Sequence, residues 1–447
     1  MRRRSTPVLI VLGVSAWLTA CDTREQIEEI LRDPTTHELY AASLRKAGLA
    51  DNAVARTWAL AAQDAMERPL GVDLPFREEG FLDPTEPRAL VFAVDAERGQ
   101  RLAVDVSMDA VVSGRVFVDL FRSPSDSAEA PFHEADLSEG SERLEYRVPR
   151  SGRFLVRVQP EILHGGSYVV EIQVLPTLAF PVEGKDQGAI LSRYGVSREG
   201  GRRQHRGVDI FANRGTPALA AAAGRVSRVD TTNLGGYVVW VRDDIDNSNL
   251  YYAHLDRQLV REGDRVEIGD TVGLVGNTGN ARTTPPHLHF GIYQRRRGAL
   301  DPWYFIHPQD SVASLPAAGG PEPGSWLRTA ASGVRVRFAP NGRAETIREL
   351  DRDTPVRVMG RVAGWLRVQL PDKVEGYAAE RSLGALGSPV RVTTMAVGTP
   401  VRTLPRPDAP VLRSLDDSAV DVQGIYGDYA LVLEDDGSEG WVAFQDS

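Results

Sequence analysis

The sequence predicts a mostly β, multidomain chain with a short helical region near its N-terminus. Apolar residues recur at three- and four-residue spacing only before about residue 71, which is the helical period. Beyond that point they alternate along short runs separated by Gly, Pro, Ser and Asp, as short strands do. With 447 residues, the chain has room for several domains of roughly 100–200 residues each.

The first residues have the pattern of an export signal. Three arginines precede an apolar run, residues 8–18, that is too short to span a bilayer. The following LTAC resembles the lipobox of bacterial lipoproteins, which implies removal of residues 1–20 and lipidation of Cys21. We therefore expect a membrane-anchored protein outside the cytoplasm, with no membrane-crossing helix. Asp22 resembles an inner-membrane retention signal, which implies the periplasmic face if the organism is Gram-negative. An ordinary signal with a chance cysteine is the alternative.

Charge and cysteine usage exclude several functions. The formal net charge is −9, so the composition gives no support for a nucleic-acid partner. Cys21 is the single cysteine, and the chain can therefore form neither an intrachain disulfide nor a zinc site made of thiolates.

The N-terminal half divides into a helical spacer and a sandwich. Residues 21–71 have helical periodicity, with a break at Pro34 and a possible N-cap at Thr36. We expect His37, which lies in this region, to be on the surface. Residues 72–175 contain six strand-like runs at regular spacing, which favours a β-sandwich. Their order resembles the prepeptidase C-terminal type of sandwich.

The C-terminal half continues the β pattern. Residues 176–310 hold further strand-like runs with many glycines at turns, which indicates an antiparallel β domain. Residues 311–324 are rich in Ala, Gly, Pro and Ser and are typical of a linker. Residues 325–386 and 387–447 repeat one pattern with a period of roughly 65 residues, which predicts two small barrels. The matched positions are Pro340 with Pro405, Leu350 with Leu415, and Tyr377 with Trp441.

Four residues within the range 176–310 have metal-site spacing. His205 and Asp209 form H-x-x-x-D across a glycine that allows a bend, and His287 and His289 form H-x-H. Three protein ligands and a free position are what a catalytic zinc requires, and imidazole with carboxylate suits zinc, although other divalent metals bind such sets. Because side chains alternate on a strand, His287 and His289 should share a face.

Two neighbouring residues complete the expected site. His254, in the run LYYAHL, is placed to carry a proton or to stabilise an oxyanion. Tyr252 would share its face by alternation and so orient it or contact substrate.

These motifs carry a family resemblance. H-x-x-x-D, Y-x-H and H-x-H followed by Phe, with the framing turns GTPALAAAAGRV and REGDRVEIGDTVGLVGNTGN, are similar to the M23 zinc metallopeptidases of the lysostaphin and LytM type. The resemblance implies one Zn²⁺ per chain held by His205, Asp209 and His289, with His254 and His287 as catalytic histidines.

The resemblance also implies hydrolysis of peptidoglycan cross-links, between glycines or at D-Ala–diaminopimelate bonds.

The sequence departs from this family at one position and resembles another family in its tail. Pro285 stands where M23 members usually have glycine, which bears on substrate contacts rather than on metal ligands. The two tail repeats resemble bacterial SH3 modules, which often bind the cell wall.

Two alternative functions stay open. One is an M23-like scaffold that activates a wall amidase and performs no chemistry of its own, and the other is a lipoprotein that only binds the wall.

Overall fold

The computed structural model describes residues 32–110, 113–124, 130–138, 140–295, 297–307, 320–416, 418–433 and 439–444. Cys21, Asp22 and most of the predicted linker lie outside these ranges. Within them, no helix has both the length and the apolar character needed to cross a bilayer. Strands predominate, and the prediction of a mostly β chain with several sheets is confirmed.

Two helices, α2 (Thr36–Lys46) and α3 (Ala53–Glu67), begin the described chain. The N-cap of α2 is Thr35, one residue before the predicted Thr36, and it forms a capping box with Glu38. Both helices pack on the sandwich that follows, and the indole of Trp58 donates to the carbonyl of Pro160 at 2.8 Å. The helical region is thus attached to the sandwich.

The sandwich places two sheets face to face around one apolar core. One sheet has the order β1-β3-β8-β5-β6, and the strands β2-β9-β4-β7 form the other face. The strands are β1 (Leu70–Gly71), β2 (Phe76–Leu82), β3 (Leu90–Ala96), β4 (Gln100–Ala110), β5 (Val116–Arg122), β6 (Phe132–Asp136), β7 (Arg143–Arg147), β8 (Gly152–Pro160) and β9 (Gly166–Pro176).

A ten-stranded antiparallel sheet, with a separate two-stranded hairpin of β11 and β12, carries the histidine motifs. Its central order is β10-β13-β20-β17-β16-β15-β18. The strands are β10 (Ile190–Ser192), β11 (Ser197–Arg198), β12 (Arg203–Gln204), β13 (Val208–Phe211), β14 (Pro217–Leu219), β15 (Gly224–Thr232), β16 (Gly236–Asp243), β17 (Asn249–Gln258), β18 (Arg265–Val266), β19 (Thr271–Val275), β20 (His287–Gln294) and β21 (Gly298–Leu300); the short helix α4 (Trp303–Ile306) follows.

The tail forms two similar small β modules. The strands of the first are β22 (Trp326–Thr329), β23 (Val334–Arg337), β24 (Thr346–Leu350), β25 (Pro355–Val362), β26 (Trp365–Gln369), β27 (Glu375–Ala379) and β28 (Leu383–Ala385). Those of the second are β29 (Arg391–Thr394), β30 (Pro400–Arg402), β31 (Val411–Ser414), β32 (Ala419–Tyr426), β33 (Tyr429–Leu433) and β34 (Glu439–Ala443). The hairpins β25–β26–β27 and β32–β33–β34 recur with equal strand lengths, as the sequence repeat predicts.

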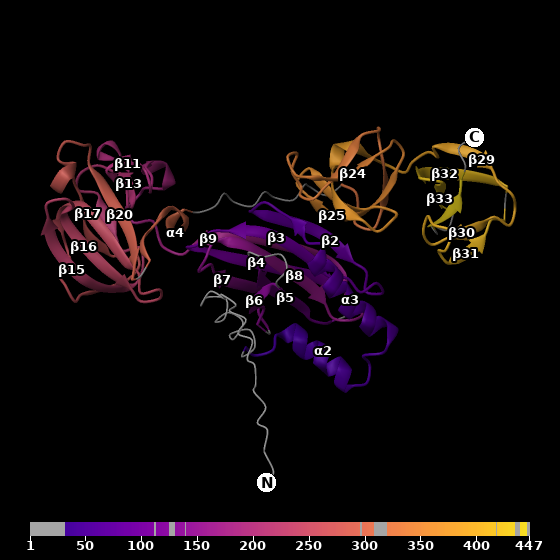
Figure 1. Cartoon of the computed structure of the whole chain (residues 1–447), viewed down its shortest axis with the longest axis horizontal. Helices are drawn as coiled ribbons and strands as arrows, with labels where there is room; N and C mark the ends of the chain where they lie inside the picture. The colour runs from indigo at the N-terminus through magenta and orange to yellow at the C-terminus, as the bar shows by residue number, and fades with distance from the viewer. Residues whose placement is uncertain are drawn as a thin grey trace, which may run out of the picture.

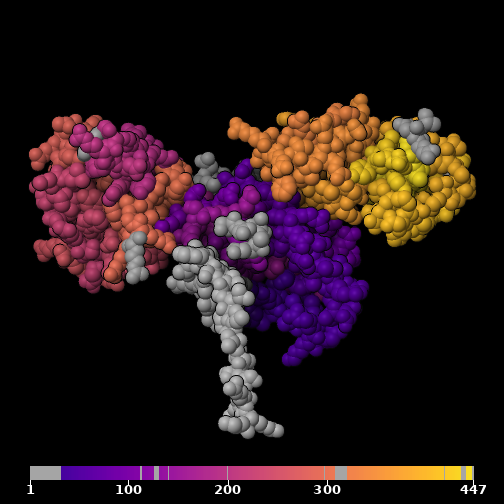
Figure 2. All heavy atoms as spheres, in the orientation of Figure 1, coloured from indigo at the N-terminus to yellow at the C-terminus, as the bar shows by residue number. Residues whose placement is uncertain are grey.

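The spatial order of the modules differs from their order in the chain. Strand β2 of the sandwich pairs antiparallel with β25 of the first tail module, so one sheet runs through both. Figure 1 shows the sandwich in the middle, the histidine-bearing module at one end and the two tail modules at the other. In the space-filling view of Figure 2, the histidine-bearing and tail modules form separate lobes on either side of the sandwich.

Candidate metal centre

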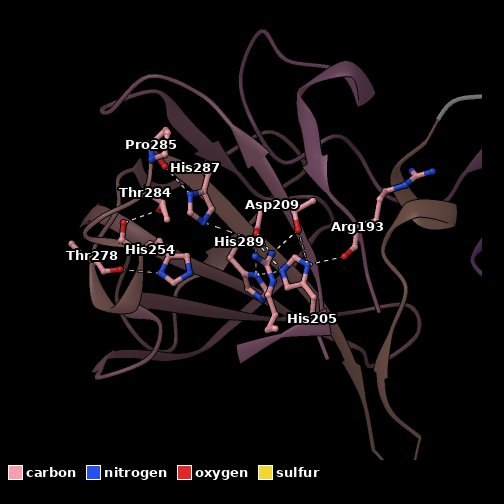
Figure 3. Close-up of polar contacts among 12 residues, drawn as sticks. Arg193, His205, Asp209, His254, Thr278, Thr284, Pro285, His287 and His289 are labelled. Carbon is pink, nitrogen blue, oxygen red and sulfur yellow. Dashed lines mark hydrogen bonds and ion pairs between the residues drawn. The ribbon is translucent and has the colours of Figure 1, made fainter. Parts of the chain in front are cut away.

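Three side chains converge on one point of the ten-stranded sheet (Figure 3). His205 Nε2 lies 2.9 Å from Asp209 Oδ1 and 3.0 Å from His289 Nδ1. His289 Nδ1 lies 2.9 Å from the same carboxylate oxygen. The three candidate ligand atoms therefore form a nearly equilateral triangle.

Strand register produces this convergence. Asp209 on β13 stands directly opposite His289 on the neighbouring β20. His205 precedes β13, and Gly207 lets the chain pass close to the cluster. A Cβ at Gly207 would lie 2.8 Å from Cε1 of His289 and 2.4 Å from the carbonyl oxygen of Phe290, so the close approach requires glycine.

Two further contacts orient the candidate ligands. His205 Nδ1 lies 2.8 Å from the carbonyl oxygen of Arg193, which fixes the proton on Nδ1 and leaves Nε2 as the ligand atom. The guanidinium of Arg198 donates to Asp209 Oδ2 at 2.6 Å, which leaves Oδ1 facing the two imidazoles. Arg198 is not predictable from the sequence, because nothing in its local pattern marks it as a site residue.

The donor set fits a zinc ion. Neighbouring ligands of a tetrahedral zinc lie roughly 3.3 Å apart when each bond is about 2.0–2.1 Å, close to the edges of this triangle. Two imidazoles and one carboxylate leave a coordination position open, as catalytic zinc sites do.

The other two histidines lie beside the triangle with a common arrangement. His254 Nδ1 is 2.9 Å from the carbonyl oxygen of Thr278, and His287 Nδ1 is 2.9 Å from that of Pro285. A carbonyl oxygen only accepts, so each Nδ1 carries the proton and each Nε2 is left as an acceptor. His287 Nε2 lies 4.0 Å from Asp209 Oδ1. The three predicted ligands and the two predicted catalytic histidines thus line one groove.

Comparison with known proteins matches this module to a family. Residues 203–302 match the peptidase family M23, and residues 332–384 match the bacterial SH3 domain. The chain therefore carries an M23 peptidase domain. Its first tail module is correspondingly a bacterial SH3 domain.

Individual relatives match part of the chain. The chain is 36% identical over 136 residues to an L-Ala–D-Glu endopeptidase of Bacillus subtilis, covering 28% of this chain and 41% of that protein. It is 43% identical over 101 residues to the peptidoglycan DD-endopeptidase ShyC of Vibrio cholerae, covering 21% and 22%. The solved structure of LytU is 35% identical, with a TM-score of 0.25, and covers 26% of this chain and 83% of that one. The matches span less than half the length of these two curated relatives.

A local backbone irregularity in the M23 domain corrects the expectation for Tyr252. His254 has a φ of 63°, and the register between β17 and its neighbours shifts around it, so the alternation of side chains is interrupted. Tyr252 is fully buried in the core, where its hydroxyl accepts from the N–H of Ala221 at 2.9 Å. Its neighbour Tyr251 lines the groove instead, with its ring edge-on to His289 at 5.9 Å.

Burial and neighbouring charge keep two of the groove histidines, His254 and His289, neutral. Burial, followed by repulsion from His289 and His287, lowers the pKa of His254 to about 4. Burial likewise lowers the pKa of His289. Burial raises the pKa of Asp209, but the adjacent His205 and His289 outweigh burial and hold the pKa of this carboxyl well below its usual range. The cluster therefore combines the neutral imidazole of His289 with the ionised carboxylate of Asp209, which are the protonation states that metal ligands require.

The groove around the cluster has a volume of about 720 Å³ and is open to solvent. Trp240, Tyr251 and Tyr293 pack together on one side, with ring centroids 4.3–6.1 Å apart. Leu234, Asn280 and Thr284 belong to the loops that complete its lining. Its size and its apolar and aromatic lining suit an extended peptide.

Proposed function

We propose that the chain is a zinc endopeptidase that hydrolyses peptide cross-links of bacterial peptidoglycan. The main support is the triangle formed by the ligand atoms of His205, Asp209 and His289, which lie 2.9–3.0 Å from one another. Two further histidines beside this triangle direct their Nε2 atoms toward the same groove. Two relatives of the M23 domain, an L-Ala–D-Glu endopeptidase and a peptidoglycan DD-endopeptidase, support this substrate class.

Zinc held by His205, Asp209 and His289 would supply Lewis acidity toward a scissile carbonyl and an attacking water. His287 has its Nδ1 proton held by Pro285, so its Nε2 accepts the proton of the attacking water. The imidazolium then gives that proton to the amine nitrogen as the C–N bond breaks. His254 is neutral above about pH 4 and has its Nε2 on the same side, where it accepts a hydrogen bond from the water and helps to orient it.

The remaining modules position this chemistry. A lipid on Cys21 would anchor the chain to a membrane, facing the periplasm or the cell envelope, and Asp22 favours retention at the inner membrane of a Gram-negative cell. The bacterial SH3 domain and its repeat at residues 387–447 would bind the wall. The sandwich would hold the M23 domain at a fixed distance from them.

Substitution of one ligand tests the proposal. His289→Ala should lose bound zinc, measured by mass spectrometry of the metal, and should release no soluble muropeptides from purified peptidoglycan. His307→Gln, in the same region but outside the cluster, should keep both. Wild-type hydrolysis by His289→Ala would contradict the metal mechanism. Stoichiometric zinc with no hydrolysis, but with stimulation of a wall amidase, would instead favour the scaffold alternative.

A further inference from the structure

A second, smaller cavity lies where the sandwich meets the M23 domain. Helix α4 stands between these two modules in Figure 1. The ring of Phe305 on α4 packs so closely on Gly99, just before β4, that a Cβ there would lie 2.4 Å from it. Beside this contact is a cavity of about 270 Å³, and both modules contribute to its lining. It shares no lining residue with the histidine groove.

The charged groups of this cavity do not balance. Among the described residues, three arginines and one carboxylate line it. Arg98 and Arg147 belong to the sandwich, whereas Arg297 lies between β20 and β21 and Asp246 lies between β16 and β17. Arg147 pairs with Asp246 across the junction, with its Nη1 3.2 Å from Oδ2. This pair neutralises one of the three positive charges, and two remain.

The two remaining guanidiniums have no carboxylate partner anywhere in the described chain. Arg98 donates to the neutral amide oxygen of Gln294, and the side chain of Arg297 forms neither a hydrogen bond nor an ion pair there. Burial, followed by repulsion from Arg297, lowers the pKa of Arg98, and the more weakly acting Asp246 opposes this. Two like charges from two different modules therefore face one cavity without compensation.

We propose that this cavity binds a phosphoryl group between Arg98 and Arg297. A guanidinium binds phosphate oxygens through parallel hydrogen bonds, and a tetrahedral oxyanion has enough oxygens to serve two guanidiniums at once. The volume is just below the range of about 300–1,000 Å³ that is typical of ligand pockets, so the ligand is small. Val148, Pro149 and Phe305 supply an apolar part of the lining for any group attached to the phosphate.

The bound anion would join the two modules. Arg98 belongs to the sandwich and Arg297 to the M23 domain, so a ligand that contacts both favours the arrangement in which they face each other. This role is independent of the proposed peptidase chemistry, because the cavity and the histidine groove are separate.

Calorimetric titration of the zinc-loaded full-length protein tests the site. Inorganic phosphate and glycerol 3-phosphate are titrated at constant ionic strength, with acetate as the comparison anion. We expect phosphate to bind about tenfold or more tighter than acetate, in line with charge-assisted hydrogen bonds to a second guanidinium. Binding of inorganic phosphate alone would identify the free ion as the ligand, and binding of both would identify the phosphoryl group of an organic molecule. If neither bound more tightly than acetate, the proposal would be wrong.

Arginine variants assign the binding to this cavity. Arg98→Gln/Arg297→Gln should lose about tenfold or more in phosphate affinity, with an unchanged thermal midpoint when no anion is present. The single variant Arg297→Gln changes an exposed side chain and should lose affinity in the same direction. Arg295→Gln removes another exposed arginine, two residues away and outside the cavity lining, and should keep the wild-type affinity. Unchanged affinity in the double variant would show that phosphate binds elsewhere.

Asp246→Asn should increase the affinity. This change removes the carboxylate from the described lining and releases Arg147, so phosphate should bind about threefold tighter. An arginine cluster that only holds the modules together predicts the opposite, since the variant breaks the ion pair across the junction. Weaker phosphate binding by Asp246→Asn would therefore overturn the proposed site.

Discussion

At the level of single residues, backbone carbonyls set the protonation pattern of the groove histidines. The carbonyls of Thr278 and Pro285 hold the Nδ1 protons of His254 and His287. His254 adopts a left-handed backbone conformation with a φ of 63°, which costs free energy in a residue with a side chain. Its N–H donates to the carbonyl of Gly235 at 2.7 Å, which helps to hold this conformation. The backbone is therefore locally strained at the residue whose imidazole points into the groove.

The two adjacent tyrosines of β17 should respond differently to substitution. Tyr252→Phe leaves the buried N–H of Ala221 without its acceptor, so the free energy of unfolding should fall by about 1–3 kcal/mol while kcat/KM of the folded protein stays unchanged. Tyr251→Leu removes a ring from the groove lining and should lower kcat/KM on cross-linked peptides. Thermal unfolding and peptide hydrolysis measure the two effects.

Tyr237→Phe provides the matched control, because Tyr237 is 40% exposed and lies outside the groove. It should change neither stability nor activity. If Tyr252→Phe lost activity while its stability stayed unchanged, Tyr252 would have to contact substrate as the sequence predicted.

At the level of elements, local patterns predicted the site and long-range packing decided the rest. H-x-x-x-D and H-x-H each lie within one short segment, and one strand pairing brings them together, so their sequence spacing is informative. Tyr251 lines the groove in place of Tyr252 because the backbone is irregular at His254. Simple alternation of side chains along a strand does not predict such an irregularity. His37 was expected on the surface and is 7% exposed, because α2 packs on the sandwich.

The burial of His37 predicts a pH dependence of stability. Its ring stacks on Trp58 with centroids 4.6 Å apart, and its Nε2 lies 2.7 Å from Gln159 Oε1. Burial, and then the charge of Arg157, lower its pKa below that of the unfolded chain. The unfolded state therefore binds more protons as the pH falls below about 6.5, so stability is complete at higher pH and is lost on acidification. The melting temperature should fall between pH 7.5 and pH 5.5.

His37→Gln isolates this effect, since an amide can donate to Gln159 but does not titrate. Its melting temperature should fall less than that of the wild type over the same interval. The carboxyl of Glu38 has a pKa of about 2, set chiefly by its bond to Arg32, and so does not titrate in this range. Parallel decreases in both proteins would show that His37 is not the titrating group.

At the level of the whole molecule, a buried polar network joins the sandwich to the bacterial SH3 domain. Glu78 on β2 accepts from Arg367 on β26 at 3.0 Å and from Tyr168 on β9 at 2.6 Å. Tyr377 on β27 donates to the other oxygen of Glu78 at 3.1 Å. Glu78 and Arg367 are 289 residues apart in sequence, and no local pattern could indicate that they meet.

Breaking this network should cost far more than breaking a surface pair. The side chains of Glu78 and Arg367 are 0% and 1% exposed, so Arg367→Met leaves a buried carboxylate without its cation. The free energy of unfolding should decrease by about 3–5 kcal/mol in denaturant titrations. Arg335→Met removes an exposed pair with Glu349 in the same domain, and it should cost about 1 kcal/mol or less.

The same variants show whether the network fixes the arrangement of the modules. With β2 paired to β25 and Glu78 bound to Arg367, the first tail module and the sandwich should move as one body. Arg367→Met should therefore increase the radius of gyration in X-ray scattering, whereas Glu78→Gln/Arg367→Met, which removes both charges, should recover most of the lost stability. If Arg367→Met matched Arg335→Met in stability and scattering, the strand pairing alone would hold the joint. The distance between the tail modules and the groove of the M23 domain would then not depend on these buried charges.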